Sequence, residues 1–300
     1  MKKIALWAMC IAVMVLSGCR KAPEWKAEHV FVIGLDGWGA YSVEKADMPN
    51  VKALMDAGCY TLKKRSVLPS SSAVNWASMF MGAGPELHGY TEWGSRTPEL
   101  PSRVLNEHGI FPTVFSELRK AAPDAEMGVL YEWDGIKYLV DTLALNHHAQ
   151  APDYNTHPTA LCDMACEYIT QKKPVLSAFC FDNPDHVGHG YGHDTPAYYA
   201  KLRELDGYVG RIVDAIKEAG IYENSIIIVT ADHGGINKGH GGKTMEEMET
   251  PFIIAGKNIK KGGAFEESMM QFDCASTIAS VFNLEQPQVW IGRPMTQVFE

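Results

Sequence analysis

The sequence predicts an α/β fold in which a mainly parallel central sheet is flanked by helices. Short apolar segments alternate along the chain with longer amphipathic ones, an order typical of strand–helix repeats that build a parallel sheet. Two of the short segments, HVFVIGL and SIIIVTA, are apolar almost throughout, as expected of strands covered on both faces. The longest amphipathic segment has a proline in its first turn and is followed by Gly220, which is the usual chemistry of helix ends.

The individual elements follow from the same patterns. Strands are expected where short β-branched or apolar runs lie between turn signals: His29–Leu35, Met127–Tyr131, Pro174–Phe181, Ser225–Ala231 and Pro251–Ala255. Helices are expected over the amphipathic segments: Met48–Ala57, Thr113–Ala121, Pro158–Gln171, Pro196–Ala219 and Asp273–Phe282. Residues 86–112 and 132–157 lack a clear period, and we interpret them as surface excursions near a site.

The first 19 residues predict export and a lipid anchor. Lys2 and Lys3 precede an apolar run of 13 residues, shorter than the roughly 20 that span a bilayer, so residues 1–18 are expected to form a signal peptide. The run closes with Leu-Ser-Gly before Cys19, which resembles a bacterial lipobox. We therefore expect lipid on Cys19 to anchor the exported protein, facing the periplasm or the cell surface. An ordinary cleaved signal peptide is the alternative.

The remaining chain is acidic and has the length of one domain. Residues 19–28 are expected to form a tether and residues 29–300 a single domain. Without residues 1–18, 25 basic and 36 acidic side chains remain, a net charge of −11. This balance argues against binding to nucleic-acid polymers or to anionic membrane surfaces, and a small molecule is the expected partner. The five later cysteines do not have the spacing of a disulfide scaffold or of a four-cysteine zinc site: Cys59, Cys162, Cys166, Cys180 and Cys274. Burial is the favoured explanation for Cys162 and Cys166.

Acids and histidines gather where three predicted strands end. Asp36 ends the first strand, the run DNPDHVGHGYGH (182–193) follows the third, and Asp232-His233 ends the fourth. In an open α/β sheet, ligands bind beyond the carboxyl ends of the strands, so these groups are expected to meet in one crevice, joined by His240. Carboxylates and imidazoles suit Zn²⁺, with Mn²⁺ or Fe²⁺ as alternatives. His186 and His193 are alternative metal ligands in the same cluster, and Asp182 is a candidate to orient one of the ligands. His147 and His148 are expected to be a surface pair.

The stretch PSSSAVNW (69–76) places three serines ahead of a predicted helix. Ser70 and Ser71 are interpreted as loop or capping residues. Ser72 would open the helix, where the backbone amides favour an anion.

The ordered set of motifs resembles the alkaline phosphatase superfamily and, within it, the type I phosphodiesterase/nucleotide pyrophosphatase branch. The resemblance spans residues 29–295 and is carried by GLDG (34–37), PSSSAVNWASMFMGAGPELHG (69–89), NPDHVGHGYG (183–192), TADHGG (230–235), GHGG (239–242), TPFIIAGK (250–257), DCASTIASVFNL (273–284) and IGRPM (291–295). The resemblance implies a three-layer sandwich and a metal-dependent phosphoric ester hydrolase that works through a covalent phosphoserine.

The resemblance also implies roles for single residues. One zinc ion would be bound by Asp36, Asp232 and His233 beside the nucleophile Ser72. A second would be bound by Asp185, His189 and His240. Asn75 would donate a hydrogen bond to a phosphoryl oxygen. Two such ions can stabilise both the attacking and the leaving oxygen, and metal coordination activates a serine hydroxyl.

Departures from the family pattern leave the substrate open. The segment after the HG motif, HGYTEWGSRTPELPSR, lacks the family's usual nucleotide-binding residues, so Glu92, Trp93 and Trp76 are expected to shape a different pocket. A phosphomonoesterase, a phosphonate hydrolase or a phosphotransferase would use the same residues, and a non-catalytic binding lipoprotein is the alternative outside enzymes. A sulfatase is disfavoured because the serine stretch lacks the proline and arginine of the sulfatase signature.

Overall fold

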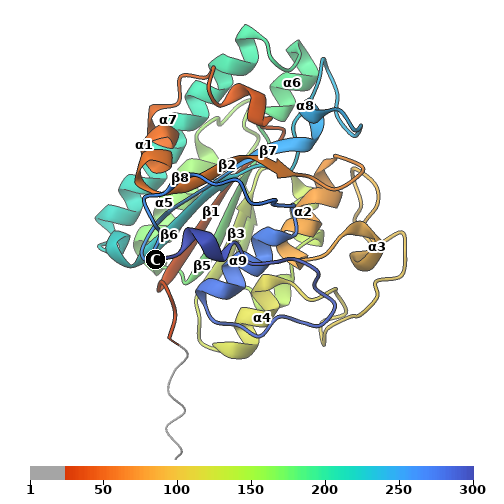
Figure 1. Ribbon diagram of the computed structural model, residues 1–300, viewed down its shortest axis with the longest axis vertical. Coiled ribbons are helices and arrows are strands. Elements are labelled where there is room, and N and C mark those ends of the chain that lie inside the picture. The colour runs from red at the N-terminus through yellow and green to blue at the C-terminus, as the bar shows by residue number, and fades with distance from the viewer. Residues whose placement is uncertain (1–23) are drawn as a thin grey trace, which may run out of the picture.

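The computed structural model describes residues 24–300 (Figure 1). The expected signal peptide, Cys19 and the first half of the tether lie outside the described residues, so the lipid anchor stays a prediction. None of the helices in residues 24–300 combines the length and apolar character needed to cross a bilayer.

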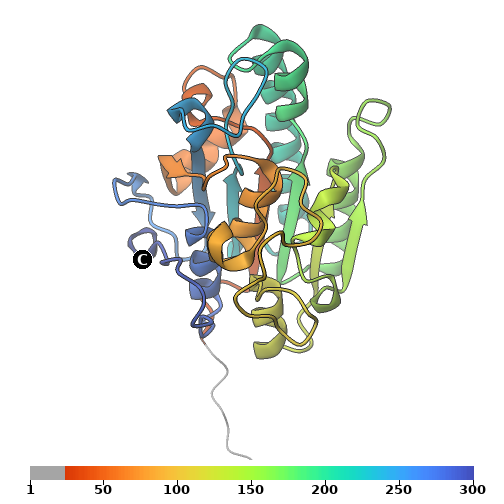
Figure 2. The same ribbon diagram turned by 90° about the vertical axis from the view of Figure 1, so that its right-hand side faces the viewer.

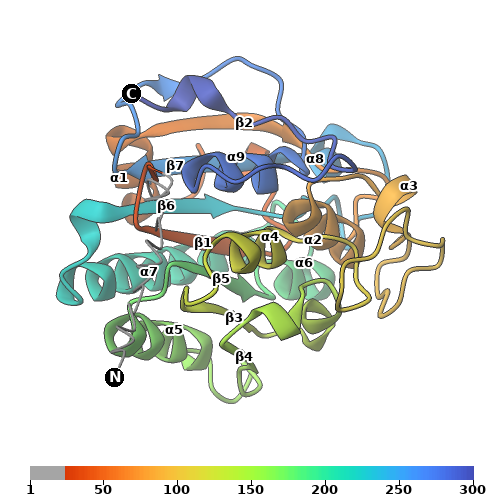
Figure 3. The same cartoon turned by 90° about the horizontal axis from the view of Figure 1, so that it is seen from below.

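One sheet of eight strands runs through the described residues, in the order β4-β3-β5-β1-β6-β7-β2-β8. The strands are β1 His29–Leu35, β2 Cys59–Arg65, β3 Met127–Tyr131, β4 His147–Gln150, β5 Leu176–Phe181, β6 Ser225–Thr230, β7 Glu249–Gly256 and β8 Gly263–Ala264. Strands β4, β3, β5, β1 and β6 are all parallel to one another, whereas β7 is antiparallel to both β6 and β2. The mainly parallel sheet is confirmed, and Figure 3 shows the strands in this order from β2 to β4.

Helices cover both faces of the sheet and form two apolar cores. The helices are α1 Pro49–Ala57, α2 Ser72–Met81, α3 Pro85–His88, α4 Val114–Ala121, α5 Ala160–Lys172, α6 Asp185–Tyr191, α7 Pro196–Glu218, α8 Met245–Met248 and α9 Asp273–Val281. One core packs α1, α5 and α7 against the sheet, and the other packs α2, α4 and α9 against the opposite face. Figure 2 looks onto the face covered by α2 and the loops that follow it. The three-layer sandwich is confirmed.

The five predicted strands and five predicted helices all exist, with boundaries shifted by at most two residues. The expectation for residues 132–157 was wrong in part, because His147–Gln150 forms the edge strand β4. Its sequence, HHAQ, is polar and its side chains are mostly exposed, so the segment lacks the apolar pattern of a buried strand. His147 and His148 lie at the surface, as expected. All five described cysteines are unpaired. Cys162 is buried and Cys166 half-buried.

The buried His88 joins α2 to the loop that follows α3. The Tyr90 amide donates to Nδ1 of His88 (3.1 Å), so Nε2 carries the proton and donates to Ser78 Oγ (2.9 Å) on α2. Burial lowers the pKa of His88 to about 3. The unfolded chain therefore binds a proton that the folded chain does not between about pH 6.5 and 3, and stability falls as the pH falls through this window.

Acidification from pH 7 to pH 5 is expected to cost the wild type about 2 kcal/mol of unfolding free energy through His88 alone. His88→Gln can still accept from Tyr90 and donate to Ser78, and it does not titrate in this range. Urea unfolding of both proteins at pH 7 and pH 5 measures how much unfolding free energy each one loses. The other titrating groups contribute equally to both proteins, so the difference in loss belongs to His88. An equal loss of stability in both proteins would contradict this role.

Candidate active site

Three strands bring the acids and histidines to one place. Asp36 follows β1, Asp232 and His233 follow β6, and α6, which begins at Asp185, follows β5. Because β5, β1 and β6 are neighbouring parallel strands, their carboxyl ends meet at one edge of the sheet. The predicted crevice is therefore confirmed as a cluster of side chains.

The first group of the cluster is fully buried. His233 Nε2 lies 3.3 Å from Asp36 Oδ1 and 3.4 Å from Asp232 Oδ2. Neither of these carboxylate oxygens has a hydrogen-bond partner within the described residues. Burial, together with the charge of Asp232, raises the pKa of Asp36, and burial raises the pKa of Asp232 to about 7. The unpartnered oxygens of both acids therefore face His233 without a hydrogen bond or an ion pair to compensate their burial.

The second group lies nearer the surface. Asp185 Oδ2 is 3.1 Å from His189 Nε2 and 3.8 Å from His240 Nε2, and the two Nε2 atoms are 3.1 Å apart. Ligand atoms of Asp185, His189 and His240 all lie within 4.8 Å of one another, and so do those of Asp36, Asp185 and His233. Asp185 is therefore within reach of both groups.

The imidazoles are oriented as metal ligands usually are. Nδ1 of His189 lies 2.9 Å from the Lys238 carbonyl, Nδ1 of His233 lies 2.7 Å from the Gly234 carbonyl, and Nδ1 of His240 lies 3.1 Å from the Ser70 carbonyl. A proton on each Nδ1 leaves the Nε2 lone pair facing the acids, as in histidines that bind a metal through one ring nitrogen while the other donates to a carbonyl.

Protonation of these rings is linked to metal binding. Burial lowers the pKa of His233, and burial and its neighbour His233 lower the pKa of His240 to about 4. Hydrogen bonding to Asp185 raises the pKa of His189 to about 9, so a bound cation would displace a proton there. Unpartnered carboxylate oxygens and converging Nε2 atoms fit divalent cations of the zinc type.

Gly37 allows the two groups to approach each other. It has a φ of +70°, and a Cβ at this position would lie 2.6 Å from Cβ of Asp185. A side chain here would push α6 away from the end of β1. The Asp36 carbonyl accepts the Asp185 amide at 3.0 Å and holds the same contact.

The serine stretch lies against this cluster. Ser71 is the N-cap of α2 and Ser72 its first residue. Ser72 Oγ lies 3.2 Å from His233 Nε2. Ser70 Oγ donates to the Gly242 carbonyl (2.7 Å) and accepts from the Gly241 amide (3.2 Å), which fixes the loop that carries His240. Of the three serine hydroxyls, that of Ser72 is the one in hydrogen-bond reach of a candidate metal ligand.

The expected role of Asn75 needs correction. Its Nδ2 donates to the carbonyls of Val67, Pro69 and Ser71 at 3.0–3.2 Å, and its Oδ1 accepts the Val67 amide at 2.7 Å. The side chain is fully buried, so its amide has no hydrogen left for a phosphoryl oxygen. Asn75 holds the serine loop in shape.

Trp76 also differs from expectation. Its indole Nε1 donates to Asp36 Oδ2 at 2.9 Å, and its ring packs so closely on Gly34 that a Cβ there would overlap it. The side chain is only 1% exposed. Trp76 therefore orients Asp36 and does not line a substrate pocket.

The buried Lys64 was missed by the sequence analysis. Its Nζ donates to the Ala231 carbonyl (2.7 Å) and to Gln271 Oε1 (2.5 Å), directly behind Asp232. Burial lowers its pKa, whereas the charge of Asp232 opposes that shift. The sequence shows two adjacent lysines in the alternating segment CYTLKKR, so one of them has to point to the inner face. Half-exposed strands normally carry lysines on the solvent side, however, and this pattern alone does not reveal a buried lysine.

The other candidates lie around the cluster. His193 Nε2 is 3.4 Å from Asp185 Oδ1, and neither atom has a hydrogen-bond partner within the described residues. His186 is exposed and packs on Tyr154 rather than on the cluster. Asp182 accepts a hydrogen bond from the Tyr154 hydroxyl at 2.6 Å.

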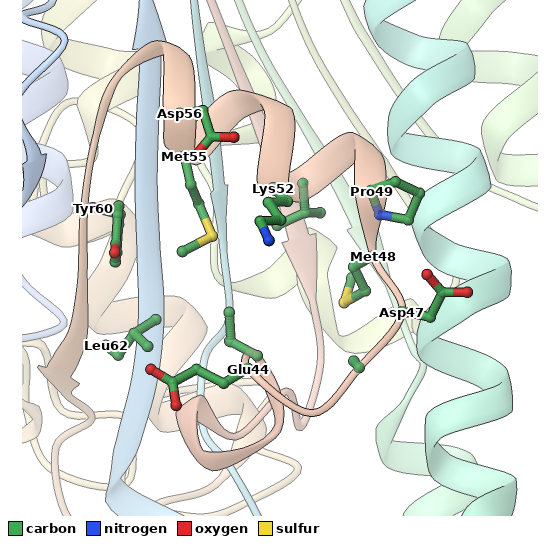
Figure 4. A pocket seen from close by; sticks show the side chains of 12 residues that line it. Glu44, Asp47, Met48, Pro49, Lys52, Met55, Asp56, Tyr60 and Leu62 are labelled. Carbon is green, nitrogen blue, oxygen red and sulfur yellow. The ribbon is translucent and has the colours of Figure 1, made fainter.

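A cleft of about 690 Å³ opens beside Ser71, His189 and His240. Glu92 and Trp93 line it, as the sequence predicts. A separate hollow of about 450 Å³ lies over α1 and β2 (Figure 4). Met48, Met55 and Lys52 line this second hollow, and none of the cluster's acids or histidines does. The cleft beside Ser71 is therefore the one that reaches the candidate metal ligands.

The sequence is similar to those of known phosphodiesterases. The sequence model of the family "Type I phosphodiesterase / nucleotide pyrophosphatase" matches residues 30–275. The human ectonucleotide pyrophosphatase/phosphodiesterase family member 5 is 30% identical over 216 residues, which cover 69% of this chain and 45% of that protein. Venom phosphodiesterase 2 of Crotalus adamanteus is 23% identical over 238 residues, 73% of this chain and 28% of that one. The chain thus spans half or less of the length of these curated relatives.

A solved structure confirms the fold. The murine ectonucleotide pyrophosphatase/phosphodiesterase 5 superposes with a TM-score of 0.73 at 14% identity, over 91% of this chain and all of that one.

Proposed function

The chain belongs to the type I phosphodiesterase/nucleotide pyrophosphatase family, and on this premise we propose that it hydrolyses small phosphodiesters through a phosphoserine at a site for two zinc ions. The observation that carries the proposal is the contact of Ser72 Oγ with His233, whose Nε2 also faces two unpartnered carboxylate oxygens. A hydroxyl in this place is next to the charge that would activate it.

The acids and histidines of the cluster form two sets of metal ligands in this proposal. Asp36, Asp232 and His233 would hold one cation beside Ser72, and Asp185, His189 and His240 would hold the other. When bound, the two cations supply positive charge for the attacking and leaving oxygens and activate the hydroxyl and water.

Ser72 acts as the nucleophile in this scheme. Its Oγ attacks phosphorus in line, the bond from phosphorus to the leaving oxygen breaks, and water then cleaves the phosphoserine ester. Trp76 keeps Asp36 in position through its indole hydrogen bond. Asn75 holds the serine loop in shape, and Ser70 joins that loop to the loop that carries His240.

Kinetics on two matched esters test the reaction class. With zinc restored after chelation, we expect bis-nitrophenyl phosphate to be hydrolysed with a higher kcat/KM than nitrophenyl phosphate. Chelated enzyme should lose turnover of both and regain it with zinc. A preference for the monoester by several factors of ten would assign the site to a phosphomonoesterase instead, and a protein that binds no transition metal and stays inactive with zinc would be a binding protein.

A further inference from the structure

A lysine side chain lies entirely inside the protein, behind the candidate metal ligands. Lys64 belongs to β2 and is fully buried. Its Nζ donates to the Ala231 carbonyl at 2.7 Å and to Gln271 Oε1 at 2.5 Å. Lysines normally keep their ammonium in water, because burial of a charge is costly. Both hydrogen-bond partners are neutral groups, which indicates that this ammonium has a role beyond packing.

The side chain of Gln271 extends these contacts to helix α2. Gln271 is also fully buried. Its Nε2 donates to the carbonyls of Ala231 and Asn75, each at 3.3 Å, and its backbone amide donates to the Arg65 carbonyl on β2 at 2.8 Å. Asn75 lies in the first turn of α2. Lys64 and Gln271 therefore form a buried bridge between the end of β6 and the first turn of α2.

The two segments that the buried bridge joins carry the groups expected to react. Ala231 directly precedes Asp232 and His233 in the chain, and Asn75 lies in the same helical turn as Ser72. The contact of Ser72 Oγ with His233 Nε2, at 3.2 Å, joins the same two segments on the side of the site. The buried bridge and this contact thus close a ring. A nucleophile has to be held to within about half an ångström of its productive position, and such a ring limits how far the two segments can move apart.

The buried bridge lies away from the cleft through which a substrate would enter. Neither of its side chains is exposed, and neither lines the cleft beside Ser71. Its hydrogen bonds go to backbone carbonyls of the two segments and not to the metal ligands' side chains. Any effect of the buried bridge on the reaction is therefore transmitted through the positions of β6 and α2.

We propose that Lys64 and Gln271 are positioning residues, which hold Ser72 at its working distance from the cation expected beside it. The kinetic part of this inference rests on the proposed phosphodiesterase function. The joining of β6 to α2 does not depend on that function. A residue that acts only on the placement of the nucleophile should change kcat and leave KM unchanged.

Lys64→Met tests the role of the ammonium, because methionine is of similar length and is uncharged. We expect the variant to bind two zinc ions and to keep the wild-type KM for methyl nitrophenyl phosphate. Its kcat should fall by about tenfold to a hundredfold, since a misplacement of about 1 Å can cost that much. Lys63→Met is the matched control: it makes the same change one residue earlier, at a lysine that pairs with Glu266 at the surface, and it should keep the wild-type kcat.

Gln271→Met is the second variant, in case Lys64→Met does not fold. It breaks the contact with the Asn75 carbonyl and leaves Lys64 bonded to Ala231. Its kcat should fall about tenfold, again at unchanged KM. Because the two side chains form one bridge, the double variant should lose little more than Lys64→Met alone. Losses that multiply would show that the two residues act independently and would overturn the bridge.

Hydrogen exchange of the metal-free proteins tests the bridge without reference to the reaction. In Lys64→Met and Gln271→Met, the amides of residues 69–81 and 226–236 should exchange about fivefold faster or more, because each lost hydrogen bond lowers the free energy of local opening. The amides of α7, which lies on the other face of the sheet, should exchange at the wild-type rate. Lys63→Met should match the wild type throughout.

The outcomes distinguish this inference from the proposed function. A zinc-loaded wild type that fails to hydrolyse methyl nitrophenyl phosphate would overturn the phosphodiesterase function, while hydrogen exchange would still decide whether the buried bridge joins β6 to α2. Wild-type kcat and wild-type exchange in both folded variants would overturn the inference and leave the function standing. A fall in kcat that comes with lost zinc or a raised KM would also contradict it, because the residues would then only support the structure of the site.

Discussion

Ser72→Ala is expected to lower kcat for phosphodiester hydrolysis by about 10⁴-fold or more, the usual effect of removing a covalent nucleophile. Ser72 is the first residue of α2, and its Oγ contacts His233. Alanine fits the same helix position, so the substitution removes the attacking oxygen and leaves the acids and histidines in place. Steady-state rates on methyl nitrophenyl phosphate measure the loss, and mass spectrometry of acid-quenched protein should find a phosphoryl group on the wild type but not on the variant.

Ser71→Ala is the matched control for this experiment. Ser71 is also buried, and its Oγ has no hydrogen-bond partner in residues 24–300. Its removal therefore breaks no bond and should cost far less, about tenfold at most. The opposite result, with Ser71→Ala inactive and Ser72→Ala active, would show that the nucleophile is one residue earlier.

The parallel part of the fold was predictable because burial leaves a strong pattern. The strands β1 and β6 lie at the centre of the sheet and are buried along nearly their whole length, which produces the continuous apolar runs in the sequence. The strands β2 and β4 lie nearer the two edges and mix polar and apolar residues. Strand β2 pairs with β7, far along the chain, and β4 is a short, mostly exposed edge strand, so the local pattern does not reveal either of them.

The cluster of acids and histidines was predictable for a similar reason, since strand ends in a parallel sheet share one edge. The roles of individual polar side chains were not. Asn75 and Trp76 both lie four or fewer residues from Ser72, yet one bonds three carbonyls of its own loop and the other bonds Asp36. Lys64 reaches Ala231 and Gln271, each more than 160 residues away. Such contacts are decided by tertiary packing, which residue type and spacing do not encode.

Asp185→Asn is expected to remove one of two bound zinc ions per chain, weaken the other, and lower kcat about a thousandfold or more, since a metal contributes several kcal/mol to such a transition state. Asp185 lies within reach of both ligand groups. Asparagine has nearly the same shape as aspartate, so the substitution removes the negative charge and changes the packing little. Metal content of the purified protein and a zinc titration of activity measure the two effects.

Thermal unfolding with and without zinc distinguishes lost metal binding from lost structure. A ligand at 100 times its Kd stabilises the folded state by about 2.7 kcal/mol per site, so zinc should raise the unfolding temperature of the wild type more than that of Asp185→Asn. The metal-free variant should unfold at a lower temperature than the metal-free wild type, because it loses the ion pair with His189, so the increase caused by zinc is compared within each protein. Asp182→Asn is the control: it changes an acid three residues away that bonds Tyr154 and belongs to neither group, and it should keep two ions. If Asp185→Asn bound two ions as tightly as the wild type, the second metal site would have to be built from other residues.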